Sequence, residues 1–230
     1  SHSLDWIGQD LSTAAQDDRV LDQDLLTLRS LVCHSVLTIA TQDLSTTAQD
    51  DSRENHNHAY MKLLAELTNE TFGLEGGIRK EPYKVRRAAR AVLFNEKGEI
   101  AFQKVERDGF YKLPGGGVDA GETVEEGLRR EILEEVGCEI TIGEEVGMVI
   151  EYRNEFGVLQ FSYVWLAKID GELGEPALEQ EEIEEGMVPM WMTPEDAMDA
   201  LKSSSTELYK AKFIVKRDIM ILEEAMKLMK

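Results

Sequence analysis

The sequence predicts an α/β protein in which helices cover both faces of a mixed β-sheet, preceded by an N-terminal extension with helical character. Three observations lead to this prediction. Strand and helix patterns alternate after residue 60, the composition changes sharply near that residue, and hydrophobic residues make up 42% of the 230 residues. A chain of this length and composition can bury a sizeable core.

Residues 1–60 form the predicted extension. They contain no lysine and hold all four histidines, and residues 9–18 and 42–51 match at nine of ten positions. Two near-identical copies do not make a solenoid, which leaves a recent duplication, a leader added for expression or an unusual extension. Leucines at helical spacing over residues 21–31 predict a helix. We expect a chain without this extension to keep its activity, so residues 61–230 form the predicted functional domain.

The second part of the chain carries the strand and helix signals in order. Short apolar, β-prone segments predict strands at 87–94, 100–105, 139–152, 158–169 and 188–192. Apolar spacing and capping residues predict helices at 122–136, 194–201 and 207–230, with a loop at 171–186 rich in Gly, Pro and Glu. The final helix has more apolar positions than an exposed helix needs. It therefore either packs on the sheet, which we favour, or forms a homodimer contact.

The charge and the cysteine content exclude several classes of protein. Forty-five acidic against 25 basic residues give a net charge of -20, which repels nucleic-acid polymers. Two cysteines cannot build a disulfide framework, and no leader or apolar stretch long enough to span a bilayer is found. We therefore expect a cytoplasmic protein without a membrane or nucleic-acid partner. The absence of histidine after residue 60 excludes histidine catalysis there.

Residues 115–138 hold the residues most suited to chemistry. Three consecutive glycines at 115–117 allow a ligand to approach the backbone closely. Thr123 and Glu126 have the spacing of a capping box, and Gly137 stands where a helix C-cap belongs. The segment therefore predicts a glycine loop that leads directly into a helix.

Three carboxylates share one face of this helix. Glu131, Glu134 and Glu135 lie at positions i, i+3 and i+4, where they repel one another, and Arg130 can pair with Glu134 at i+4. Hard divalent cations such as Mg²⁺ or Mn²⁺ prefer carboxylate oxygens, so a metal site is predicted. The alternatives are a solvated Glu-rich face and a structural Ca²⁺ site.

The whole segment matches the pattern Gly-x5-Glu-x7-Arg-Glu-U-x-Glu-Glu-x-Gly-U, in which U is a bulky apolar residue. The matching residues are Gly116, Glu122, Arg130, Glu131, Ile132, Glu134, Glu135, Gly137 and Cys138. This segment resembles the Nudix box, and residues 85–226 resemble a Nudix hydrolase of the MutT-like nucleotide pyrophosphohydrolase type. The final Cys138 departs from the usual aliphatic residue.

The resemblance implies an α/β/α sandwich and cleavage of the diphosphate in a nucleoside diphosphate linked to another group. It implies that Glu131, Glu134 and Glu135 bind Mg²⁺ or Mn²⁺, with the Gly115 carbonyl as a further ligand. Three further roles are implied: Glu122 supports the loop with Gly116 and Gly137, Arg130 orients a glutamate, and Glu131 or Glu134 acts as the base.

A loop glutamate and several cations complete the predicted site. Relatives often take a base or ligand from a loop beyond the sheet, and the candidates here are Glu181, Glu182, Glu184 and Glu185, of which Glu182 is our choice. The cations near the first strand and the glycine loop are Arg86, Arg87, Arg90, Lys104, Arg107 and Lys112. We select Arg87, Lys104, Arg107 and Lys112 as phosphate-binding residues; for each, an ordinary surface charge is the alternative.

The substrate is the least specified property. The segment past the box, residues 151–156, contains no proline, which disfavours ADP-ribose. We therefore expect a nucleoside triphosphate or a similar small nucleotide. The alternatives are ADP-ribose or a nucleotide sugar, a dinucleoside polyphosphate, and a non-catalytic Nudix-like regulator that senses nucleotides.

Overall fold

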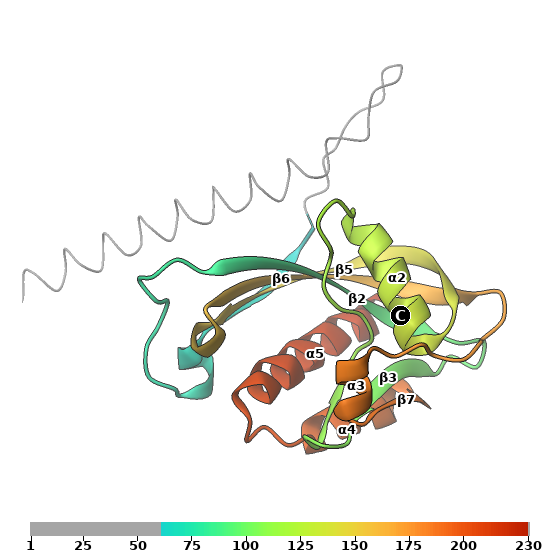
Figure 1. Cartoon of the computed structure of the whole chain (residues 1–230). Helices are drawn as coiled ribbons and strands as arrows, with labels where there is room; N and C mark the ends of the chain where they lie inside the picture. The colour runs from blue at the N-terminus through green and yellow to red at the C-terminus, as the bar shows by residue number, and fades with distance from the viewer. Residues whose placement is uncertain (1–60, 230) are drawn as a thin grey trace, which may run out of the picture. The chain divides into compact units, whose positions relative to one another are not determined.

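A seven-stranded mixed sheet organises residues 61–229, the part of the chain that this computed structural model describes (Figure 1). The strands are β1 (Leu63–Leu67), β2 (Lys84–Phe94), β3 (Ile100–Val105), β4 (Phe110–Lys112), β5 (Glu139–Arg153), β6 (Val158–Asp170) and β7 (Met187–Met192). The helices are α2 (Val124–Val136), α3 (Gln180–Glu184), α4 (Pro194–Ser203) and α5 (Tyr209–Leu228). The predicted extension, residues 1–60, lies outside the described residues, as does Lys230.

The sheet has the order β1-β5-β6-β2-β3-β4, with β7 on the other edge of β3. β1 pairs with β5, and β2 with β6, in parallel, whereas the remaining pairs are antiparallel. β2 and β3 pair at a single position, Phe94 with Ile100, and then diverge. This divergence opens a gap at the edge of β2, into which the glycine loop fits.

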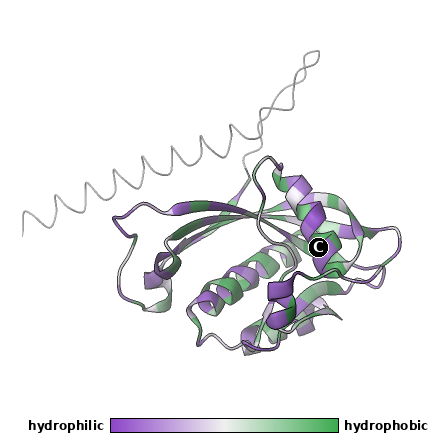
Figure 2. Cartoon of the chain, viewed as in Figure 1, coloured by the Kyte–Doolittle hydropathy of each residue, from purple (hydrophilic) through white to green (hydrophobic). Residues whose placement is uncertain are grey.

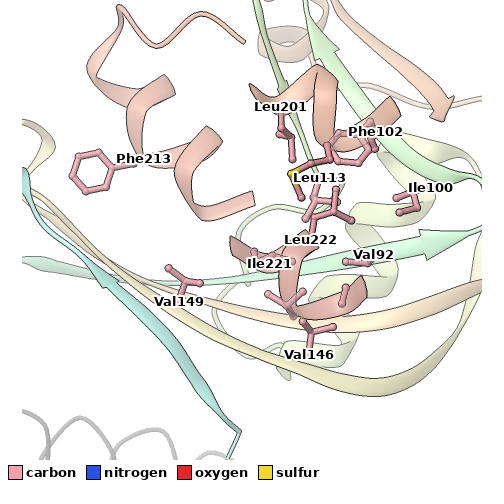
Figure 3. Packing of buried hydrophobic residues seen from close by; sticks show 14 of the residues in the cluster. Val92, Ile100, Phe102, Leu113, Val146, Val149, Leu201, Phe213, Ile221 and Leu222 are labelled. Carbon is pink, nitrogen blue, oxygen red and sulfur yellow. The ribbon is translucent and has the colours of Figure 1, made fainter. Parts of the chain in front are cut away.

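Alternation along β2 sends its side chains to two separate cores. Ala89, Ala91 and Leu93 pack with Leu128 and Ile132 of α2. Val92 faces the other way, into a cluster with Val149 of β5 and with Phe213, Ile221 and Leu222 of α5 (Figure 3). Helices therefore cover both faces of the mixed sheet, as predicted.

The long final helix packs on the sheet, which was the favoured interpretation of its apolar positions. Phe213, Ile221, Leu222 and Ala225 are fully buried, and hydrophobic and hydrophilic segments alternate along α5 in Figure 2. A homodimer contact is not needed to explain these residues. No helix within residues 61–229 combines the length and hydropathy needed to cross a membrane.

Two strands and one helix were not predicted. β1 and β4 span only five and three residues, too few for an alternating pattern to stand out. The predicted loop at 171–186 was wrong in part, because it contains α3. This five-residue helix has no apolar stripe, and the side chain of Glu182 caps it by accepting a hydrogen bond from the Glu179 backbone at 2.9 Å.

A charged cluster is buried between the sheet and α5. Glu151 of β5 is fully buried and accepts hydrogen bonds from Arg153 at 2.7 Å, Gln160 at 2.6 Å and Ser162 at 3.0 Å. Arg217 of α5 lies 3.5 Å from the same carboxylate. Burial alone would raise the pKa of Glu151, but the charges of Arg153 and Arg217 outweigh it and lower the pKa to about 2.

We expect Glu151→Gln to lower the free energy of unfolding by about 3–5 kcal/mol, because Arg217 would remain buried without a full counter-charge. The native pKa lies below the ordinary value of 4.5. The stabilisation is therefore complete above pH 4.5 and is lost as the pH falls toward 2. Urea unfolding between pH 6 and 2.5 measures both effects, with the exposed Glu172→Gln as control. Equal stability of the two variants would contradict the prediction.

Candidate active site

The glycine loop takes the place that β3 vacates beside β2. Ala91 N–H donates to the Pro114 carbonyl at 3.2 Å, and Ala89 N–H donates to the Gly116 carbonyl at 3.0 Å. Farther along, Val118 N–H donates to the Arg87 carbonyl at 3.1 Å. The loop therefore continues the hydrogen-bond ladder of the sheet, and its backbone has a fixed position.

Two of the glycines are required by close approach. Gly115 has φ +117, and a Cβ there would lie 2.2 Å from the Ala89 carbonyl oxygen. A Cβ on Gly116 would lie 2.0 Å from Glu131 Oε2. The loop therefore packs directly against the sheet on one side and against a carboxylate of α2 on the other.

We expect Gly115→Ala to lower the free energy of unfolding by at least about 1–3 kcal/mol, because both the positive φ and the contact with Ala89 oppose a side chain. Gly98→Ala is the matched control, since Gly98 has φ +78 but nothing within 4 Å of its Cβ position. Chemical denaturation of both variants separates backbone strain from the steric clash. Equal losses would show that the close approach costs nothing.

Helix α2 has the predicted caps and ends at the predicted Val136, but it begins at Val124, two residues later than predicted. Thr123 Oγ accepts the Glu126 N–H at 3.2 Å, the Glu126 carboxylate accepts the Thr123 N–H at 2.8 Å, and Gly137 ends the helix with φ 81. Leu128 and Ile132 are fully buried against the sheet. This buried stripe fixes the rotation of the helix and turns its glutamates toward the glycine loop.

Arg130 binds the surrounding carboxylates together. Its Nη1 lies 2.9 Å from Glu131 Oε1 and 3.1 Å from Glu134 Oε2, and the latter is the predicted i,i+4 pair. Its Nε lies 2.9 Å from Glu122 Oε1, and its Nη2 donates to the Gly117 carbonyl at 2.8 Å. The hydrogen bond from Arg130 holds the pKa of Glu122 below its usual range.

Glu135 is turned toward the start of the loop. Its side chain is 1% exposed and accepts the Gly115 N–H at 2.5 Å and Lys112 Nζ at 3.0 Å. Gln103 of β3 donates to the Glu135 carbonyl at 2.9 Å. Although helical spacing places three glutamates on one face, two of them therefore meet Arg130 and the third meets Lys112.

The three buried or half-buried glutamates near the loop share one electrostatic environment. Burial raises the pKa of Glu131, and the charge of Glu135 raises it further. Burial and the charge of Glu135 raise the pKa of Glu182 to about 7, although the hydrogen bond from the Glu179 N–H acts in the opposite direction. Glu182 of α3 therefore lies within electrostatic reach of the carboxylates of α2.

The donor chemistry of this site fits a hard divalent cation. Within residues 61–229 no three acidic, histidine or cysteine side chains are arranged to coordinate one metal ion. Arg130 and Lys112 form ion pairs with the carboxylates instead. Among the loop and turn N–H groups of residues 61–229, none donates a hydrogen bond to the Gly115 carbonyl. Carboxylate and carbonyl oxygens are the ligands that Mg²⁺ and Mn²⁺ prefer.

The remaining candidates divide between the site and the outer surface. Arg87 Nη2 donates to the Glu122 carbonyl at 3.4 Å, and Lys112 contacts Glu135. Lys104 instead pairs with Glu106 at 3.0 Å, and Arg107 with Asp108 and Glu185. These last two cations contact none of the glutamates of α2.

The other loop glutamates also lie apart from the helix carboxylates. Glu181 and Glu184 are exposed, and Glu185 pairs with Arg107 at 2.8 Å and Lys210 at 2.6 Å. Glu182, by contrast, lies close enough to the carboxylates of α2 for the charge of Glu135 to raise its pKa.

Sequence reasoning missed two residues that support the loop from behind. Gln103 holds the end of α2 through the Glu135 carbonyl, and Asp218 of α5 accepts the Leu113 N–H at 2.8 Å. Neither belongs to a spaced motif. The available signals were an amide within an apolar strand, Gln103, and an acid within an apolar helix, Asp218.

The chain is similar to several known proteins. A family model described as "NUDIX domain" matches residues 84–212. The 8-oxo-dGTP diphosphatase of Haemophilus influenzae is 29% identical over 116 residues, 46% of this chain and 85% of that protein. An RNA pyrophosphohydrolase of Wolbachia pipientis is 40% identical over 60 residues, 26% of this chain and 37% of that protein.

Two solved structures also match the chain at low sequence identity. The solution structure of the E. coli ORF135 protein matches with a TM-score of 0.46 and 24% identity, over 64% of this chain and 91% of that chain. A NUDIX hydrolase from Nitrosomonas europaea matches with a TM-score of 0.48 and 16% identity, over 63% of this chain and 90% of that chain.

Proposed function

The chain belongs to the Nudix family and is a Nudix-type pyrophosphohydrolase, and on this premise we propose that it hydrolyses a nucleoside triphosphate or a similar small nucleotide with the help of a divalent metal. The observation that carries the proposal is the set of carboxylates that Arg130 gathers beside the glycine loop. Glu131, Glu134 and Glu135 are the proposed ligands, with the Gly115 carbonyl. Members of this family typically use divalent metals.

A bound Mg²⁺ or Mn²⁺ would neutralise phosphate charge and make the attacking water more acidic. The chain's own residues do the rest. Arg130 orients Glu131 and Glu134, and Glu122 holds Arg130 in place. Lys112 and Arg87 lie near enough to the carboxylates to meet phosphate oxygens.

The proton of the attacking water needs a carboxylate base, since residues 61–230 contain no histidine. Glu131 and Glu134 are proposed for this role, and Glu182 is proposed as a further base or ligand from α3. The raised pKa values of Glu131 and Glu182 support these assignments, because a carboxylate with a raised pKa is a stronger base.

Two observations favour a small nucleotide over an RNA end. The similarity to the 8-oxo-dGTP diphosphatase extends over 85% of that protein, against 37% for the RNA pyrophosphohydrolase. The net charge of -20 also disfavours a polyanionic polymer. ADP-ribose or nucleotide sugars and dinucleoside polyphosphates are the alternative substrates.

The experiment that tests the proposal is a hydrolysis assay of the full chain with Mg²⁺ or Mn²⁺. Nucleoside triphosphates, including 8-oxo-dGTP, are compared with nucleotide sugars, ADP-ribose, dinucleoside polyphosphates and 5′-triphosphorylated RNA. Phosphate products are identified by chromatography. We expect turnover of a triphosphate that stops with a chelator and returns with excess Mg²⁺.

The outcomes separate the candidate functions. Preferred turnover of a sugar nucleotide or dinucleoside polyphosphate would reject the triphosphate but keep the reaction class. Tight nucleotide binding without turnover under any metal would favour a sensor. A chain that begins at Met61 is expected to show unchanged turnover, and a large loss would give residues 1–60 a role in catalysis.

A further inference from the structure

Two arginines beside the site have buried N–H groups without hydrogen-bond partners. Arg90 of β2 is 6% exposed, and neither its Nε nor its Nη1 has a partner. Arg217 of α5 is 0% exposed, and its Nη2 has none. Unsatisfied donors on a buried cation are costly, so a native protein that keeps them needs a reason.

Four arginines and two fully buried carboxylates form the cluster that holds these donors. The cluster between the sheet and α5 contains the cations Arg86, Arg90, Arg153 and Arg217 and the carboxylates Glu151 and Asp218; the charge of Glu131 also acts on Arg86, and that of Glu135 on Arg90. Both carboxylates are already engaged, Glu151 by Arg153 and Asp218 by Arg217 Nε at 2.7 Å. Burial, together with the charge of Arg217, lowers the pKa of Arg90 to about 9. Although these carboxylates belong to the same cluster, Arg90 Nε and Nη1 remain without a partner.

The place of Arg90 connects this centre to the proposed catalytic carboxylates. Its Cα lies 3.1 Å from the Cβ position of Gly115. The charge of Glu135 raises the pKa of Arg90, and the charge of Arg90 in turn lowers that of Glu131. Arg90 therefore lies between the carboxylates of α2 and the pair formed by Arg217 and Asp218.

Arg86 marks the open side of the cluster. It precedes Arg90 by four residues on the same face of β2, is solvent-exposed, and donates to Gln160 at 2.5 Å. A Cβ on Gly117 would lie 3.0 Å from Arg86 Nη2. The arginines on this face of β2 thus lead from solvent at Arg86, past the glycine loop, to the buried unpaired donors of Arg90.

We propose that Arg90, with Arg217 behind it, binds the non-bridging oxygens of a phosphoryl group of the substrate, next to the diphosphate bond that is cleaved. Three unpaired donors need a ligand with several acceptor oxygens, which a phosphoryl group offers, and the planar guanidinium matches that geometry. Asp218 positions both Arg217 and the chain just before the glycine loop, because its Oδ1 accepts a hydrogen bond from Arg217 and its Oδ2 accepts one from the Leu113 N–H. This inference rests on the proposed function, which supplies the phosphoryl ligand.

The test compares Arg90→Met, Arg90→Lys and the control Lys97→Met, an exposed charge in the turn between β2 and β3. Binding of inorganic pyrophosphate is measured by calorimetry with excess chelator, so that no metal contributes. Arg90→Met is expected to weaken binding at least 10-fold and to raise the KM for the best nucleotide by a similar factor. Arg90→Lys keeps the charge but lacks the planar guanidinium with its several donors, so its pyrophosphate affinity and KM should be intermediate. Lys97→Met should resemble the wild type.

Thermal stability distinguishes a binding role from a structural one. Removing an unsatisfied buried cation is expected to leave the Tm of Arg90→Met unchanged or higher, whereas a structural arginine would lower it. If Arg90→Met does not fold, Arg90→Lys carries the comparison. Pyrophosphate binding and KM unchanged in the folded variants would overturn the inference, as would a wild type that binds no pyrophosphate without metal. Arg90-dependent pyrophosphate binding in a chain that hydrolyses no nucleotide would reject the proposed function and support this inference.

Discussion

Replacing Glu134 by glutamine is expected to lower kcat by about 10²–10⁴-fold while leaving the fold intact. Glutamine has the same shape, but it lacks the charge that holds a divalent cation and cannot accept a proton. Glu134 is one third exposed and its one side-chain partner within residues 61–229 is Arg130, so little folding energy depends on it. Steady-state kinetics with saturating Mg²⁺ and a thermal melt measure the two effects.

Glu125→Gln is the matched control, because Glu125 lies on the same helix but is exposed and belongs to no part of the site. It should keep full activity and an unchanged Tm. A loss of less than 10-fold in Glu134→Gln, measured at saturating metal, would remove Glu134 from the proposed ligands and bases. A loss shared by both variants would point to the helix and not to the site.

Replacing Arg130 by lysine is the second change with a large expected effect. Lysine keeps the charge, but it cannot make the four contacts to Glu122, Glu131, Glu134 and the Gly117 carbonyl at once. The glutamates and the loop would lose their common anchor. Since small displacements of catalytic groups are costly, we expect kcat/KM to fall about 10²-fold.

Arg129→Lys separates this effect from a general change of the helix. Arg129 is the preceding residue, is exposed, and donates only to the Ile140 carbonyl among the described residues. Its replacement should leave kcat/KM within about twofold, in the range of ordinary surface substitutions. Full activity of Arg130→Lys would show that the glutamates are oriented by something other than the guanidinium.

Most of the fold could be predicted because its long elements carry strong periodic signals. β2 alternates between two cores, and α2 has a capping box, an apolar stripe and a terminal glycine. The elements that were missed, β1, β4 and α3, are three to five residues long. Their conformation depends on partners distant in the chain, such as β5 for β1, and no local pattern reports such a partner.

The proposed site divides in the same way. The spacing of Glu131, Glu134 and Glu135 could be recognised in the sequence because one helix carries all three. The divergence of Glu135 toward Gly115 could not be seen, since it depends on how the loop returns to the sheet. Arg90 looked like one surface charge among several. Its burial and its proximity to Arg217, which lies 127 positions later, arise only in the folded chain.

The pairing of the glycine loop with the edge of β2 has a kinetic consequence. Because the Ala89 and Ala91 amides donate to loop carbonyls, the loop cannot detach without breaking a ladder of the central sheet. The conformational entropy of ordering it is lost once, when the chain folds, and does not recur at each turnover. These two amides should therefore exchange with deuterated solvent as slowly as those in the middle of β6, whether or not nucleotide is bound.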